Sequence, residues 1–122
     1  MHTWIWIIVF VVFLSVLAIV RVAGQVPAEV AKKLLGEGAV IIDVRSPGEF
    51  GSGHLPKAIN IPVEQVAAEV PRRVKDKERP LLLHCQSGMR SATAQRHLRA
   101  LGYTRAFNLG SYARAAQIVG RR

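Results

Sequence analysis

The chain has 122 residues, and because the first two dozen are largely apolar, about 100 remain for a globular part, enough for one domain but not for two. One cysteine excludes an intramolecular disulfide and a multi-cysteine metal site, and the histidines show no metal-ligand spacing: His2, His54, His84 and His97. The 17 lysines and arginines against 8 acids give a net charge of +9, all of it after residue 20, so the domain surface should attract anions.

The N-terminal segment is the first predicted element. Trp4 to Val20 is an apolar run interrupted only by Ser15, and with Thr3 it reaches about 18 residues, near the minimum for crossing a bilayer. Tryptophans stand at one end and Arg21 at the other, as in a membrane anchor. We therefore predict one transmembrane helix within residues 1–24, followed by a globular domain over residues 25–122. The alternative is a cleaved secretory signal, although the positive N-terminal region of such a signal is missing.

Cations near the predicted span give its orientation. Arg21, Lys32 and Lys33 lie only on its C-terminal side, so the positive-inside rule places the domain in the cytoplasm. We predict a single-pass protein of the inner (plasma) membrane with the lipid bilayer as a partner. Cleavage as a signal peptide would instead release the domain into the periplasm.

Short apolar strands alternate with amphipathic helices in the rest of the chain. The first half of the pattern predicts a helix from Pro27 to Gly36 or Gly38, a strand over 39–44, a loop over 46–53 and a strand over 58–61. A helix over 63–70, ended by Pro71, follows. The second half predicts a strand over 81–84, a helix over 92–101, a strand over 106–109 and a last helix over 112–119. The charged connection over 72–79 is expected to be solvated rather than to bind nucleic acid. This alternation predicts an α/β fold, an open parallel sheet with helices on both faces.

The most informative stretch follows the strand over 81–84 and consists of Cys85, Gln86, Ser87, Gly88, Met89, Arg90 and Ser91. The cysteine ends a buried strand, and the backbone amides that follow can surround its sulfur. A helix N-terminus and Arg90 add positive potential, which favours a thiolate at neutral pH. Gly88 permits a tight bend, and Ser91 suits either an N-cap or a hydroxyl donor to the sulfur. The sequence therefore predicts Cys85 as a nucleophile.

The stretch from Cys85 to Ser91 resembles the active-site loop of the rhodanese family of sulfurtransferases. A second set of residues follows the order and approximate spacing of the family's other signature: Asp43-Val44-Arg45, Glu49-Phe50, Gly53-His54-Leu55, Ala58 and Asn60-Ile61-Pro62. The resemblance runs from about Gln25 to Val119 and is nearest to small single-domain thiosulfate sulfurtransferases of the phage-shock type.

The resemblance implies a rhodanese-like fold and transfer of a sulfane sulfur through a persulfide on Cys85. The implied donor is thiosulfate or a persulfide, the acceptor is cyanide, a thiol or a protein, and no metal or organic cofactor is required. Residues 86–91 would bind the substrate. Asp43, Arg45 and His54 are expected to have structural roles beside the site, and His84 should point to the opposite side of its strand from Cys85.

Two other functions remain open. Cysteine-dependent phosphatases and arsenate reductases also hold an anion between a cysteine and an arginine, but their loops resemble Cys-x5-Arg. Cys85 to Arg90 is Cys-x4-Arg, a tighter loop that suits a single sulfur better than a tetrahedral oxyanion. The other alternative is a non-catalytic, membrane-tethered rhodanese-like interaction module, although inactive domains of this kind usually lack the cysteine. Met89 places an apolar side chain at the expected pocket mouth, which favours a protein persulfide over a doubly charged donor.

Overall fold

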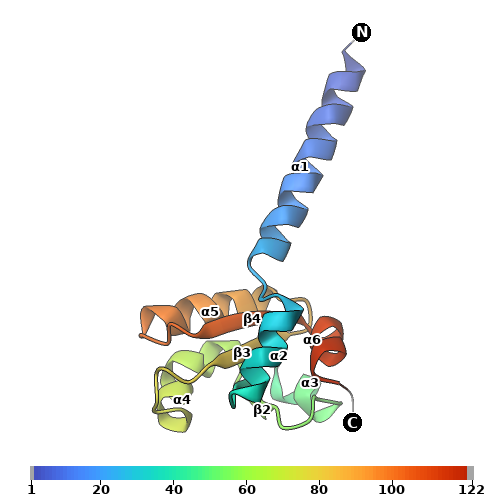
Figure 1. The fold of residues 1–122 in the computed structure, drawn as a ribbon. Coiled ribbons are helices and arrows are strands. Elements are labelled where there is room, and N and C mark those ends of the chain that lie inside the picture. The colour runs from blue at the N-terminus through green and yellow to red at the C-terminus, as the bar shows by residue number, and fades with distance from the viewer. Residues whose placement is uncertain (1, 121–122) are drawn as a thin grey trace.

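The computed structural model describes residues 2–120, without the side chains of residues 18–23. An N-terminal helix, α1 (Thr3–Ala23), projects from an α/β domain (Figure 1). The domain contains β1 (Val40–Asp43), β2 (Ile59–Asn60), β3 (Leu81–Cys85) and β4 (Ala106–Ser111), with α2 (Ala28–Gly36), α3 (Pro47–Gly51), the 3₁₀ turn η1 (Val63–Gln65), α4 (Val66–Arg73), α5 (Met89–Ala100) and α6 (Tyr112–Val119). The last helix has the bounds that the sequence predicts.

The strands form one parallel sheet in the order β2-β1-β3-β4. Asp43 on β1 pairs with His84 on β3, and Cys85 pairs with Ser111 on β4, so the carboxyl ends of three strands meet at one edge. Gln25 adds a parallel bridge to Asn108 on the outer side of β4. This topology confirms the predicted open parallel sheet and places the loop after Cys85 at the edge where such sheets bind ligands.

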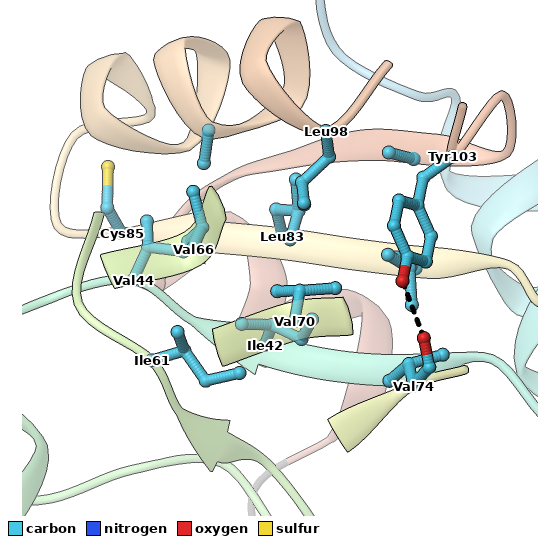
Figure 2. Packing of buried hydrophobic residues seen from close by; sticks show 13 residues of the cluster. Ile42, Val44, Ile61, Val66, Val70, Val74, Leu83, Cys85, Leu98 and Tyr103 are labelled. Carbon is cyan, nitrogen blue, oxygen red and sulfur yellow. Dashed lines mark hydrogen bonds between the residues drawn. The ribbon is translucent and has the colours of Figure 1, made fainter. Parts of the chain in front are cut away.

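Two apolar cores cover the two faces of the sheet, because successive side chains of each strand point to opposite faces. On one face, Leu81, Leu83 and Cys85 pack with Val66 and Val70 of α4 and with Leu98 of α5 (Figure 2). On the other face, Leu82 packs with residues of α2 and α6: Ala31, Leu34, Ala115 and Ala116. The prediction of helices on both faces is therefore confirmed.

The loop predicted over 46–53 is wrong in part, because α3 lies within it. The Ser46 hydroxyl accepts a hydrogen bond from the Glu49 amide at 3.2 Å, and the Glu49 carboxylate accepts one from the Ser46 amide at 3.1 Å. This is a capping box, and Pro47 is suited to the first turn that follows it. A helix of 5 residues is too short to show a periodic pattern, so only the capping signal could have revealed it.

The predicted end of a helix at Pro71 is also wrong, because α4 continues through Pro71 to Arg73. Proline lacks a backbone donor, so its position in a helix costs one hydrogen bond and some crowding. Val66, Val70 and Val74 are nevertheless buried against the sheet, and the Val74 amide donates to the Val70 carbonyl at 2.7 Å. Tertiary packing of this face therefore holds the last turn in place.

The apolar side chains described for α1, from Trp4 to Leu17, are exposed on the projecting helix. Among the residues that the structure describes, no helix is both long enough and apolar enough to cross a membrane. The transmembrane helix predicted over Thr3 to Val20 is therefore not supported by the structure.

We expect Tyr103→Phe to destabilise the protein by about 1–3 kcal/mol, because it leaves a buried carbonyl without its donor. The Tyr103 hydroxyl, on a side chain that is 1% exposed, donates to the Val74 carbonyl at 2.6 Å (Figure 2). Urea denaturation of the full chain measures this loss. Tyr112→Phe, at a half-buried tyrosine beside Arg45, is the control and should cost less. Equal losses in the two variants would contradict the assignment.

Candidate active site

Cys85 ends β3, and its side chain is fully buried on the α5 side of the sheet (Figure 2). Its sulfur accepts a hydrogen bond from the Gly88 amide at 3.0 Å, and the Ser91 hydroxyl oxygen lies 3.5 Å from it. Gly88 has φ +93°, a left-handed conformation that favours glycine, and immediately precedes α5. The helix begins at Met89 rather than near Ala92, so Ser91 lies inside its first turn and is not the N-cap.

The surroundings of the thiol favour its charged form. Burial raises the pKa of Cys85, but hydrogen bonds from the Ser91 hydroxyl and from the amides of Ser91, Gly88 and Ser87 lower it further than burial raises it. The net pKa of Cys85 is therefore below its ordinary value. The positive end of the α5 dipole acts in the same direction. Of the amides over 86–91 that the sequence suggests could surround the sulfur, the structure thus places those of Ser87, Gly88 and Ser91 beside it.

Arg90 lies near the Cys85 sulfur but is not a free cation, because its main partner is Glu49 of α3, with which it forms a bidentate pair. Glu49 first, and then the charged form of Cys85, raise the pKa of Arg90. Its two terminal nitrogens donate to the Glu49 carboxylate at 2.7 and 3.0 Å. The Arg90 hydrogen bonds, followed by the Ser46 amide, lower the pKa of Glu49 to about 2. Glu49 thus remains ionised and balances part of the field of Arg90. The sequence placed Glu49 in a signature but could not indicate a partner 41 residues away.

Asp43 and Arg45 form a buried ion pair at the end of β1, where the Arg45 guanidinium donates to the Asp43 carboxylate at 2.7 Å. The same guanidinium donates to the Gly53 carbonyl at 2.7 Å and to the Gln86 side chain at 3.4 Å. Its carbon lies 4.6 Å from the centre of the Tyr112 ring. The pair therefore ties the loop after α3 to the loop after Cys85, a placement that fits the structural role expected for it.

The two histidines near the signatures lie apart from the sulfur. His54 is exposed, stacks on Phe50 with ring centres 3.9 Å apart, and has its Nδ1 atom 2.9 Å from the Phe50 carbonyl. His84 is buried on the other face of the sheet, 5.8 Å from the Tyr112 ring, as its position on the strand predicts. Within the described part of the chain, its Nε2 atom has no hydrogen-bond partner. Burial lowers the pKa of His84, which keeps the ring neutral.

A cavity of about 560 Å³ opens beside the loop, between Gln25 and α5. Ser87, Gly88 and Met89 line it, and Met89 is 66% exposed. The Gln25 side chain lies close to both glycines, since a Cβ at Gly110 would lie 3.1 Å from it and one at Gly88 would lie 3.3 Å from it. Of the six residues predicted to bind substrate, three line the cavity, whereas Gln86, Arg90 and Ser91 contact Arg45, Glu49 and Asn108, respectively. The position of Gln25 beside the loop left no signal in the sequence.

Residues 27–114 match the rhodanese-like domain family. The chain belongs to this family. This rhodanese-like chain is 31% identical over 85 residues to the thiosulfate sulfurtransferase GlpE of Pseudomonas syringae, covering 70% of the chain and 78% of GlpE. It is 36% identical over 69 residues to the thiosulfate sulfurtransferase PspE of Escherichia coli, covering 57% of the chain and 66% of PspE. It is also 42% identical over 71 residues to the Bacillus subtilis protein YqhL, covering 58% of the chain and 55% of YqhL.

Solved structures of the family superpose on the domain. A rhodanese with anions from E. coli is 30% identical with a TM-score of 0.62, covering 69% of this chain and 94% of that one. The human single-domain sulfurtransferase TSTD1 is 30% identical with a TM-score of 0.64, covering 77% of this chain and 96% of that one. These similarities confirm the rhodanese-like α/β fold and the family that the two sequence signatures indicate.

We expect acid to weaken the fold through the Glu49 pair. The pKa of Glu49 is lowered from 4.5 to about 2 in the folded protein, so the stability linked to it is present above pH 4.5 and is lost as the pH falls towards 2. Melting temperatures measured by circular dichroism from pH 5 to 2 should therefore fall more steeply in the wild type than in Glu49→Gln. Glu69→Gln, which removes an exposed partner 3.9 Å from Arg72, is the control. Identical profiles for the wild type and Glu49→Gln would refute the assignment.

Proposed function

We propose that this protein is a sulfurtransferase that moves a sulfane sulfur from thiosulfate or a persulfide donor to a thiophilic acceptor through a persulfide on Cys85. The observation that carries the proposal is the buried Cys85 sulfur held 3.0 Å from the Gly88 amide at the N-terminus of α5. A site of this kind stabilises a sulfur anion without a metal ion. The names of the relatives GlpE and PspE, both thiosulfate sulfurtransferases, support the same reaction.

The first half-reaction loads the cysteine. The Cys85 thiolate attacks the outer sulfur of thiosulfate, a new sulfur–sulfur bond forms on Cys85, and the bond within thiosulfate breaks. The electron pair of that bond leaves with sulfite, so the total charge is conserved and no proton is required. The negative charge then lies on the outer sulfur of the persulfide, where the amides of the loop and of the first turn of α5 stabilise it.

The second half-reaction unloads the cysteine. A nucleophilic acceptor, such as cyanide, a thiolate or a cysteine of another protein, attacks the outer sulfur. The sulfur–sulfur bond on Cys85 breaks, its electron pair returns to the Cys85 sulfur, and the thiolate is regenerated. The exposed Met89 beside the cavity gives an acceptor or donor protein an apolar contact next to the loop.

The position of Arg90 distinguishes this proposal from a phosphatase or an arsenate reductase. An arginine that binds a tetrahedral oxyanion needs donor groups directed at that ligand. Here each terminal nitrogen of Arg90 donates to Glu49, and the carboxylate would repel a phosphate or an arsenate that enters the loop. The same repulsion acts on thiosulfate, which is also a dianion, so among sulfur donors the pair favours a persulfide. A non-catalytic interaction module is the main alternative function.

We also propose that α1 attaches the domain to the inner (plasma) membrane, with the domain facing the cytoplasm. The support comes from the apolar sequence of residues 4–20, the cations on its C-terminal side, and the exposure of apolar side chains from Trp4 to Leu17. A helix that is apolar on all sides is unfavourable in water. The basic domain would then lie beside anionic lipid headgroups, which attract lysine and arginine.

We expect the purified full chain to gain about 32 Da on Cys85 when treated with thiosulfate, and to lose it when cyanide is added. Intact-mass analysis measures both changes. Cys85→Ser should show neither change, while Ser87→Ala, which keeps the sulfur and the loop backbone, should still be modified. An unmodified wild-type cysteine under saturating thiosulfate and persulfide donors, in a folded protein, would favour the interaction module.

We expect the full-length protein to keep its uncleaved mass, to remain with membranes through high-salt and alkaline washes, and to be released by detergent. Because the predicted orientation is cytoplasmic, a thiol probe that cannot cross the membrane should label Cys85 only after lysis. Release by alkali, labelling in intact cells or an N-terminus near Gln25 would contradict the proposed location.

A further inference from the structure

Asn108 lies at the centre of the hydrogen bonds behind the catalytic loop. It is on β4, is 3% exposed, and has no position in the mechanism above. Its Nδ2 donates to the Gly88 carbonyl at 3.1 Å, and its Oδ1 accepts from the Gly110 amide at 2.9 Å. A carbonyl can only accept and an amide N–H can only donate, so these two backbone groups fix which end of the Asn108 amide is oxygen.

The Ser91 hydroxyl consequently has a defined direction. Its oxygen lies 2.7 Å from the Asn108 Oδ1 atom, which can only accept, so Ser91 directs its one proton there. The same hydroxyl can also donate to the Cys85 sulfur, which lies 3.5 Å from its oxygen. While its one proton is directed to Asn108, it presents only lone pairs to that sulfur. A neutral thiol can donate its proton to those lone pairs. A thiolate has no such proton and instead needs the proton of Ser91.

We propose that Asn108 is a positioning residue for sulfur transfer, because it competes with the Cys85 sulfur for the Ser91 proton. When the thiol loses its proton to solvent, the Ser91 hydroxyl rotates about its Cβ–Oγ bond and donates to the sulfur. The side-chain heavy atoms need not move. Hydrogen bonds to a charged acceptor are roughly twice as strong as neutral ones, so the thiolate takes the proton. The thiolate is then stabilised only by the difference in free energy between its hydrogen bond from Ser91 and the Ser91–Asn108 hydrogen bond that is lost.

The competition also affects the loaded cysteine, and this step rests on the proposed function. In the persulfide, the negative charge has moved from the Cys85 sulfur to the outer sulfur, so the Ser91 proton returns to Asn108. The free thiolate therefore loses the Ser91–Asn108 hydrogen bond, whereas the persulfide keeps it. Asn108 thereby favours the sulfur-loaded state over the free thiolate.

The test is a double-mutant cycle in the full chain, with the Cys85 thiol titrated by its alkylation rate against pH. No sulfur donor is present, so the result does not depend on the proposed function. We expect Ser91→Ala to raise the titration midpoint by less than about 0.5 pH units in the wild type and by about 1 unit in Asn108→Ala. Without the competing acceptor, the whole Ser91 hydrogen bond stabilises the thiolate. If Ser91→Ala shifts the Cys85 titration midpoint no further in the Asn108→Ala background than in the wild type, the proposal is overturned.

Asn60→Ala is the matched control, because the Asn60 amide also donates two hydrogen bonds to backbone carbonyls, at 3.0 and 2.9 Å, but does not contact Ser91. In the Asn60→Ala background, Ser91→Ala should shift the Cys85 titration midpoint by the same amount as in the wild type. A general loosening of the fold would change that amount. Charged groups near the site are unchanged throughout the cycle, and their effects cancel: Arg90 and Glu49 from the helices, and Asp43, Arg45 and His84 from the strand ends.

If circular dichroism shows that Asn108→Ala does not fold, a second variant at this position replaces it. Asn108→Asp keeps the oxygen acceptor for Ser91, so the Ser91→Ala shift should be no larger than in the wild type. A larger shift would contradict the proposal. Ser91→Ala alone provides a further test, since a shift above about 1 unit in the wild type would mean that Asn108 does not compete for the proton.

Discussion

The site depends on the contact between the Gly88 amide and the Cys85 sulfur at the point where β3 ends and α5 begins. A buried anion is costly unless hydrogen-bond donors surround it, and here the donors are backbone amides that have no intrahelical partner. The left-handed conformation of Gly88 turns the chain around the sulfur, and the parallel sheet fixes where that turn begins. A reactive sulfur is thus obtained from backbone geometry together with one cysteine.

Most of the remaining polar groups near the loop hold this turn in place rather than add charge to it. Glu49 caps α3 and pairs with Arg90, which links the start of α3 to α5. Arg45, neutralised by Asp43, connects the loop after α3 to Gln86. Behind the loop, Asn108 donates to the Gly88 carbonyl, and the Gln25 side chain lies close to Gly88 and Gly110. The basic net charge is therefore mainly a property of the surface, whereas the sulfur is stabilised by the Ser91 hydroxyl and by backbone amides.

The sequence predicted the parallel sheet, its helices and the position of Cys85 at the end of a strand, because these depend on local patterns: apolar strand runs and helical spacing. The role of Cys85 as a nucleophile remains a prediction. Prediction from the sequence failed where a contact across the fold decides the outcome. Arg90 resembled a free cation until Glu49, 41 residues earlier, was placed beside it. Ser91 resembled a cap because the helix start depends on the conformation of Gly88. Pro71 resembled a helix end because burial of Val66 and Val70 cannot be seen from propensity.

The central claim is that folding around Cys85 stabilises a sulfur anion. The most direct measurement compares the alkylation rate of Cys85 against pH in the folded full chain and in the same chain unfolded in urea. The account predicts a lower titration midpoint in the folded protein, because the hydrogen bonds from the Ser91 hydroxyl and the loop amides exist only there and lower the pKa of Cys85. A midpoint in the folded protein equal to or above that of the unfolded chain would contradict it.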